Sequence, residues 1–238
     1  MNNKADTNVD NTVIRPSTRR KPGEFLENLT EQLAILKELA PCYQKAFAGE
    51  PWYEVSRCTN CIRGFSAEKV GQNCKGCGVI LTTEAYPANE LIDSISKKII
   101  ARPSVVYIER GPDGAIELGA IAFESNPIAI YESSYKQSKD THPPLLDALS
   151  EKLPQHTIWL DEILADLEKQ SSGNLAHFEE MCEKIFDLLE PAVIGFRSIN
   201  KGLVNKASRV FGERCSVFPV ADCGVQSGVS FLVTIQAI

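Results

Sequence analysis

Residues 159–175 read WLDEILADLEKQSSGNL. The apolar start of this stretch predicts a strand that begins at Thr157 and ends near Ala165. Residues 170–174 are short or polar and predict a loop. From Leu175 onward, apolar residues recur at helical spacing. A strand, a loop of small residues and the start of a helix therefore follow one another directly.

This junction is suited to binding an anion. The first backbone N–H groups of a helix have no partner inside the helix, and the helix dipole adds partial positive charge there. Ser171, Ser172 and Gly173 carry no bulky side chain that would keep phosphate oxygens away from the backbone. The same residue types also occur where they only cap a helix, so the local sequence leaves both interpretations open.

The rest of the chain predicts helices and strands in the order of a mixed α/β sheet. Helices are expected near 25–40, where Pro41 interrupts the helical pattern, and near 91–99, 145–153, 175–189 and 203–211. Further strands are expected at 105–109 and 116–123, which form a hairpin, and at 192–197, 217–220 and 229–235.

Four cysteines lie in a segment without the periodicity of a core element. Cys58, Cys61, Cys74 and Cys77 follow the pattern C-x2-C-x12-C-x2-C. Two such pairs can present four thiolates to one ion, and closed four-thiolate sites are typical of structural zinc. The alternative is a redox dithiol, which a single C-x-x-C pair can form. We expect a zinc knuckle as a small insertion at residues 55–80.

The central stretch resembles the GNAT acyltransferases. Residues 159–166 look like the fourth strand of that family, and Gln170 to Leu175 is similar to its Q/R-x-x-G-x-G/A loop, which wraps the pyrophosphate of coenzyme A. The resemblance covers roughly residues 40–238. It implies a GNAT-type α/β domain at 24–238, with a mixed, mostly antiparallel central sheet flanked by helices. Residues 1–23 are expected to form a flexible tail.

The resemblance implies transfer of an acetyl group from acetyl-CoA to an amine. The backbone N–H near Leu164 would polarise the reacting carbonyl. The residues implied in coenzyme binding are Leu164, Ala165, Gln170, Ser171, Ser172, Gly173, Asn174, Leu175 and Asn200. The expected cofactors are therefore acetyl-CoA and a structural zinc ion, and the expected acceptor is a small-molecule or peptide amine.

Two adjacent carboxylates are candidates for the base that takes the proton of the amine. Asp161 and Glu162 lie on the predicted strand, where successive side chains face opposite sides, so only one is expected to face the cleft. The alternative is that both are simply exposed. Trp52, Tyr53 and Glu54 are candidates for lining the acceptor pocket.

Two departures from the family pattern support a different function. Leu175 stands where the family loop ends in Gly or Ala, and no tyrosine occurs in 199–212, although the family often places its general acid near the position of Ser208. The alternative is a non-catalytic GNAT-fold module that uses the zinc knuckle to contact a partner or nucleic acid. A redox protein that uses the two C-x-x-C pairs is a third interpretation.

Net charge and hydropathy exclude some classes of partner and location. The 238 residues carry a formal net charge of -6, which argues against nucleic acid as the main partner. Near the cysteines, a local basic patch is nevertheless suggested by Arg57, Arg63, Lys69 and Lys75. No apolar run is long enough for a bilayer, and residues 1–10 are not a secretory signal, so we expect a cytoplasmic protein without a membrane partner. A homodimer is left open.

Overall fold

The computed structural model describes residues 23–49, 52–61, 64–134, 143–165, 177–221 and 229–238. Nearly all of the predicted tail and the whole predicted loop from Gln170 to Leu175 lie outside these residues.

The described chain forms a seven-stranded sheet and a smaller three-stranded sheet. The large sheet has the order β1-β5-β6-β7-β8-β10-β9, and all neighbours are antiparallel except β7 and β8. Its strands are β1 (Glu24–Leu26), β5 (Ser104–Arg110), β6 (Ile116–Ser125), β7 (Thr157–Ala165), β8 (Val193–Ser198), β9 (Cys215–Ala221) and β10 (Val229–Gln236). The small sheet has the order β3-β2-β4, with β2 at Ser56–Arg57, β3 at Phe65–Ser66 and β4 at Thr83–Glu84.

Helices cover both faces of the large sheet. They are α1 (Leu29–Ala48), α2 (Ala88–Ala101), α3 (Pro127–Ser134), α4 (Pro143–Lys152), α5 (Phe178–Leu189) and α6 (Lys201–Phe211), which a 3-10 turn extends (η2, Gly212–Arg214). One hydrophobic core joins the sheet to α1, α2, α3 and α4, and a second joins it to α5 and α6. The predicted mixed, mostly antiparallel sheet flanked by helices is confirmed. None of the described helices has the length and apolar character to cross a bilayer.

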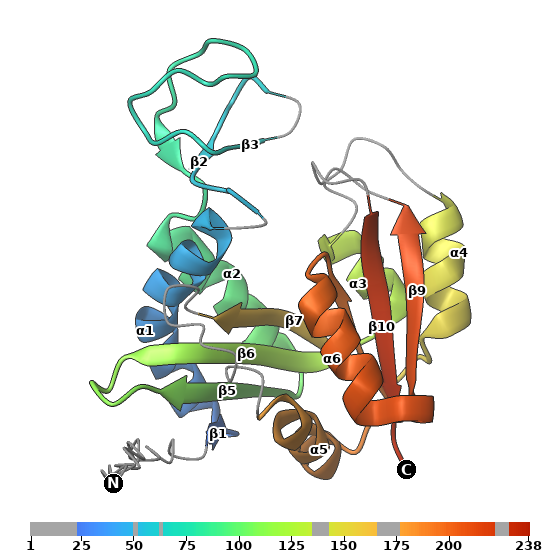
Figure 1. Cartoon of the computed structure of the whole chain (residues 1–238). Coiled ribbons are helices and arrows are strands. Elements are labelled where there is room, and N and C mark those ends of the chain that lie inside the picture. Colours follow the sequence, from blue (N-terminus) through green and yellow to red (C-terminus); the bar gives the residue numbers. More distant parts are fainter. Residues whose placement is uncertain (1–22, 50–51, 62–63, 135–142, 166–176, 222–228) are drawn as a thin grey trace, which may run out of the picture.

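The small sheet and the four cysteines form a separate projection. This segment, residues 55–85, enters after α1 and returns to α2, and we call it the knuckle. Figure 1 shows it standing beyond the ends of α1 and α2, away from the large sheet.

The large sheet opens between β7 and β8. Among the described residues, these parallel strands pair only from Thr157↔Val193 to Trp159↔Gly195. Beyond Trp159, β7 continues alongside β6 and runs away from β10, as Figure 1 shows. A Cβ at Gly195 would lie 3.3 Å from the Trp159 ring, so the glycine lets this ring pack across the last pair before the strands part.

Strand β7 contains a β-bulge at Asp161. Glu162 pairs with Ile121 and Leu160 pairs with Ala122, so Asp161 is the extra residue between two ladder positions. A bulge interrupts the alternation of side chains. The side chains of Asp161 and Glu162 consequently both reach residues of the helices on the α1 and α2 face. The expectation that only one of the two could face this side is therefore wrong.

Helix α1 does not stop at Pro41. It runs through this residue to Ala48. The proline itself is exposed, whereas Ala40, Cys42 and Tyr43 are buried in the core. Burial of this apolar face stabilises the helix on both sides of the proline, and the carbonyl that loses its N–H partner lies on a solvated side. The predicted interruption overestimated the local effect of proline.

A buried glutamine ties the first strand to the rest of the domain. Gln32 on α1 is 1% exposed. Its Nε2 donates to the carbonyl oxygens of Leu26 at 2.9 Å and Ser104 at 2.8 Å, and its Oε1 accepts from the Ser104 hydroxyl at 2.8 Å. One side chain thus links α1, β1 and β5.

Replacing Gln32 with leucine should lower the free energy of unfolding by about 2 kcal/mol or more, because two buried carbonyl groups lose their donor. Ser104→Ala removes only one hydroxyl from the same group and should cost less. Denaturant titration of the three proteins measures both differences. Equal stability of Gln32→Leu and the native chain would show that this side chain does not hold the first strand in place.

Candidate functional site

An ion pair holds the bulged residue of β7. The Asp161 carboxylate lies 2.5 Å from Nζ of Lys98 on α2, and the two side chains are 8% and 28% exposed. A carboxylate so far removed from water needs a partner of opposite charge. Lys98 therefore neutralises Asp161 and connects α2 to the point where the sheet opens.

The neighbouring carboxyl, Glu162, is in a different electrostatic state. Its Oε1 accepts a hydrogen bond from the Tyr43 hydroxyl at 2.8 Å. Desolvation, followed by the negative charge of Asp161, raises the pKa of Glu162 to about 8, against the opposing effects of Lys98, Tyr43 and Arg197. At neutral pH the Glu162 carboxyl is therefore mostly protonated, and it accepts and releases its proton near pH 8.

Aromatic rings from four segments of the chain form a cluster beside Glu162, and its members are Tyr43, Phe47, Trp52, Phe65 and Tyr86. Each ring of this aromatic cluster packs against at least one other ring. The distances between ring centroids are 4.6 Å for Tyr43–Phe47, 5.0 Å for Tyr43–Tyr86, 5.3 Å for Phe47–Tyr86, 5.4 Å for Phe47–Trp52 and 5.5 Å for Phe65–Tyr86. The members come from the end of α1, the entry and exit of the knuckle, and β3. They give the site a largely apolar wall with two phenolic hydroxyl groups.

A second tyrosine–glutamate pair lies in this wall. The Tyr86 hydroxyl donates to Glu54. Burial raises the pKa of Glu54, although the hydrogen bond from Tyr86 and the charge of Arg197 oppose the shift. Arg197 of β8 also acts on Glu162, so the two carboxyl groups share one cation across the opening of the sheet. The pKa of Tyr86 is also raised, mainly by burial. Its hydroxyl therefore stays protonated and remains a hydrogen-bond donor.

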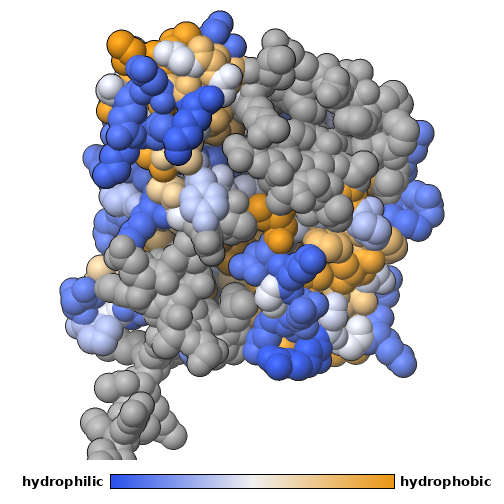
Figure 2. Space-filling view, turned by 45° about the horizontal axis from the view of Figure 1, so that its top comes forward, coloured by the Kyte–Doolittle hydropathy of each residue, from blue (hydrophilic) through white to orange (hydrophobic). Residues whose placement is uncertain are grey.

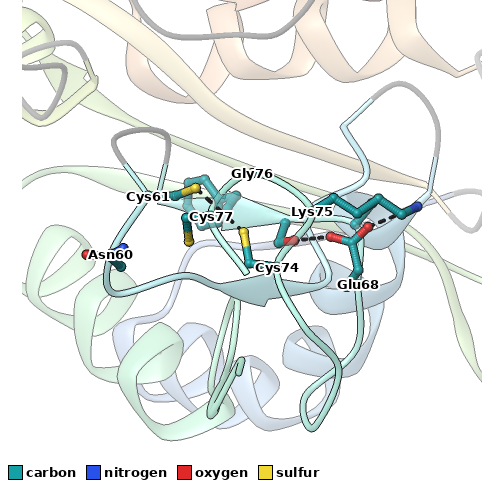
Figure 3. Close-up of a pocket in the computed structure, with 10 residues that line it drawn as sticks. Asn60, Cys61, Glu68, Cys74, Lys75, Gly76 and Cys77 are labelled. Atoms are coloured by element: carbon teal, nitrogen blue, oxygen red, sulfur yellow. Dashed lines mark hydrogen bonds and ion pairs between the residues drawn. The ribbon is translucent and has the colours of Figure 1, made fainter. Parts of the chain in front are cut away.

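The four knuckle cysteines converge as the sequence predicted. Their sulfur atoms all lie within 4.8 Å of one another, with 3.4 Å between Cys58 and Cys77 and 3.5 Å between Cys61 and Cys74. Sulfur atoms around one zinc ion, each about 2.3 Å from it, would lie about 3.8 Å apart. The four thiols therefore fit a tetrahedral zinc ion. Figure 3 shows Cys61, Cys74 and Cys77 turned toward one another at the edge of an open hollow.

The backbone around these cysteines is arranged for thiolates. The N–H of Cys61 donates to Sγ of Cys58 at 3.3 Å. A Cβ at Gly76 would lie 2.7 Å from Sγ of Cys61, so glycine is required for this approach. A hydrogen bond from the Gly76 backbone is the main cause that lowers the pKa of Cys74 to about 6. The close approach of the backbone to the sulfur atoms of Cys58 and Cys61 favours a metal-binding cluster over four unrelated thiols.

The basic residues of the knuckle are partly neutralised. Lys75 pairs with Glu68 at 3.1 Å, and Arg57 pairs with Glu90 at 3.0 Å. Arg63 lies outside the described residues. Figure 2 shows apolar and hydrophilic surface side by side in this part of the molecule, and the exposed large apolar residues of the knuckle are Val70, Val79 and Ile80. The surface is thus mixed in character.

The predicted coenzyme residues are only partly within the described structure. Leu164 is fully buried near the end of β7, where Ala165 is the last residue. Asn200 caps α6: its Oδ1 accepts from the backbone N–H of Gly202 at 2.9 Å and of Leu203 at 3.3 Å. The loop 170–175 is not described, and α5 begins at Phe178. Coenzyme contacts by all these residues remain predictions.

Comparison with solved structures identifies the architecture. No protein-family model and no curated protein sequence matches the chain. A mutant agmatine N-acetyltransferase in its apo form superposes with a TM-score of 0.54 at 9% identity, covering 91% of this chain and 100% of that one. A polyamine N-acetyltransferase of Drosophila melanogaster, which forms N-acetylagmatine, gives 0.53 at 10% identity over 91% and 100%. The chain has the GNAT acetyltransferase fold. At this level of identity the likeness concerns the fold alone.

The sequence patterns did not predict that four further residues lie at this site: Tyr43, Tyr86, Lys98 and Arg197. Tyr43 belongs to the apolar series of α1 and reads as core, and Tyr86 stands in a short connection with no periodicity. Only the tertiary structure brings them to the carboxylates. Ser208, near the expected position of the general acid, donates its hydroxyl to the carbonyl of Val204 at 3.1 Å, so it bonds within α6.

The raised pKa of Glu162 makes stability depend on pH. The folded chain keeps the Glu162 proton up to about pH 8, whereas the unfolded chain releases it near 4.5. The stabilising contribution is therefore complete below 4.5 and is lost as the pH rises through 8. The neutral glutamine of Glu162→Gln does not titrate, so its contribution to stability does not change with pH. Between about pH 5 and about pH 9, the thermal unfolding temperature of the native chain should therefore fall by several degrees relative to that of Glu162→Gln. A constant difference over this range would contradict the shift.

Proposed function

We propose that the chain is an N-acyltransferase that moves an acetyl group from acetyl-CoA to an amine. The observation that carries the proposal is the position of Glu162: a carboxyl with a raised pKa lies just after the bulge of β7, in the part of the strand that no longer pairs with β8. Among the described residues, β7 beyond Trp159 does not pair with β8, and we place the acyl end of the coenzyme beside this part of the strand. The acetyltransferase fold of the structural neighbours supports the same reaction class.

Glu162 is the proposed base. The amine must lose a proton as the new C–N bond forms, and a carboxylate can take that proton directly or through water. Tyr43 fixes the carboxylate by donating to Oε1. Asp161 is already paired with Lys98, so its proposed role is to raise the proton affinity of Glu162 and to hold the bulge.

Acetyl-CoA would supply an activated thioester at this opening. The residues proposed to hold it are the end of β7 at Leu164 and Ala165, the loop from Gln170 to Leu175, and Asn200. The fit rests on the parting of β7 and β8, which leaves β7 beyond Trp159 paired on one side in the described residues.

The aromatic cluster and Glu54 are the proposed acceptor-binding wall. Aromatic faces attract an ammonium group, and a buried carboxylate adds charge complementarity. A small-molecule or peptide amine fits this chemistry. The two structural neighbours named above act on agmatine or polyamines, which supports a cationic amine as the acceptor class to try first.

Zinc is the proposed occupant of the cysteine cluster, with a structural role. Four thiolates complete the coordination of one zinc ion and leave no position for a reacting water. The convergence of Cys58, Cys61, Cys74 and Cys77 supports this assignment over a redox dithiol, since all four sulfur atoms share one centre.

The second candidate is a non-catalytic module with the same fold. Leu175 in the predicted coenzyme loop and the lack of a tyrosine in 199–212 favour it. The acetyltransferase keeps the preference because Glu162 is placed and perturbed as a base would be.

Turnover of agmatine with acetyl-CoA, followed as release of free coenzyme A thiol, tests the enzyme directly. Glu162→Gln should lower kcat by about 100- to 10,000-fold, because the base is lost while the shape of the side chain is kept. Asp161→Asn should reduce kcat less and should reduce stability as well. Full activity in both variants would remove these carboxylates from the reaction.

Elemental analysis should find about one zinc per chain in protein purified without chelator. Cys61→Ser should lose most of this metal. Cys215→Ser, which changes a thiol outside the cluster, is the matched control and should keep it. Native protein without zinc would contradict the assignment.

A further inference from the structure

The knuckle is inserted into the wall of the proposed acceptor site. After α1 the chain passes Trp52 and Glu54, enters β2, reaches the four cysteines, and returns through β4 to Tyr86 and α2. Both connections between the knuckle and the domain are therefore segments of the acceptor wall. Only three residues separate Glu54 from the first cysteine, Cys58.

Backbone hydrogen bonds make these connections part of the small sheet. The N–H of Val55 donates to the carbonyl of Ser66 at 3.0 Å, and the N–H of Ala85 donates to the carbonyl of Val55 at 3.1 Å. The residues on either side of Val55 and Ala85 are consequently placed by the sheet. Glu54 precedes Val55 and Tyr86 follows Ala85, so the small sheet fixes the positions of these two side chains in the proposed site.

A chain of side-chain contacts continues from the knuckle to the proposed base. Phe65 of β3 stacks on Tyr86, with 5.5 Å between centroids and an interplanar angle of 28°. Tyr86 meets the edge of Tyr43 at 5.0 Å, and Tyr43 donates to Glu162. Phe65 also lines the open hollow beside the cysteines, so it touches both regions.

Among its described residues, the knuckle has only a small apolar core. Its buried hydrophobic core consists of Cys58, Cys74 and Leu81, with Cys61 packed against it. An apolar core of this size cannot offset the conformational entropy of about thirty ordered residues. Binding of a metal by four thiolates provides folding free energy in such small units.

We propose that the metal-loaded knuckle is the positioning unit of the acceptor site: it holds Tyr86 and Glu54 against Tyr43 and Glu162. Loss of the metal then weakens binding of the amine and leaves binding of coenzyme A unchanged. This inference rests on the proposed acetyltransferase function. It gives the knuckle a role inside the active site in place of a separate partner-binding role.

Tryptophan emission reports the coupling without any need for turnover. Trp52 lies in the wall, 5.4 Å from Phe47, and the second tryptophan, Trp159, is buried in the sheet. Removing zinc from the native full-length chain should shift emission to longer wavelength, and adding zinc back should reverse the shift. Trp52→Phe should lose the shift, and Cys215→Ser should retain it. Zinc-independent emission of the native chain would overturn the proposal.

Hydrogen exchange provides a second readout on the native chain. Zinc removal should raise amide exchange at 52–57 and 83–86, and it should leave β10 protected. Uniform loss of protection across the large sheet would overturn the proposal, because the metal would then hold the whole domain and not the acceptor wall.

Phe65→Ala separates positioning from metal binding. It should keep about one zinc per chain, raise KM for agmatine about tenfold or more, and leave calorimetric binding of coenzyme A unchanged. An unchanged KM would overturn the proposal. If no amine is acetylated by the native chain, the proposed function fails, while emission and exchange still decide whether the metal holds Tyr86 and Glu54 in the wall.

Discussion

Among the described residues, strand β7 pairs with a neighbouring strand on both sides only at its beginning. Up to Trp159 it pairs with β6 and β8, and beyond that residue the described pairing continues with β6 alone. The bulge at Asp161 follows at once. The parting of the strands and the bulge together create the site, because one exposes an edge of β7 and the other turns two consecutive carboxylates toward α1 and α2.

Two adjacent carboxylates at such a place are costly unless their charges are managed. Unit charges about 4 Å apart interact by about 4 kcal/mol at an effective dielectric constant near 20, so two ionised groups would strongly repel each other. Lys98 neutralises Asp161, and burial, followed by the charge of Asp161, raises the pKa of Glu162 to about 8. The arrangement separates the tasks: one carboxylate is structural and the other can exchange a proton.

The sequence predicted what depends on local patterns. Strand β7 was predicted at its observed bounds, and the spacing of the cysteines predicted their convergence. It could not predict the bulge, because alternation carries no signal for an extra residue. It also could not place Tyr86 or Lys98, since their role depends on how α2 and the knuckle pack against β7. The error at Pro41 has the same origin: burial outweighed a local preference.

Calorimetric titration of the full chain with coenzyme A decides whether the proposed coenzyme site exists. We expect binding at one site per chain, and we expect Gly173→Asp, which puts a carboxylate into the proposed phosphate loop, to abolish this binding while the protein stays folded. No heat of binding at millimolar coenzyme A, or unchanged affinity in Gly173→Asp, would contradict the proposed coenzyme site.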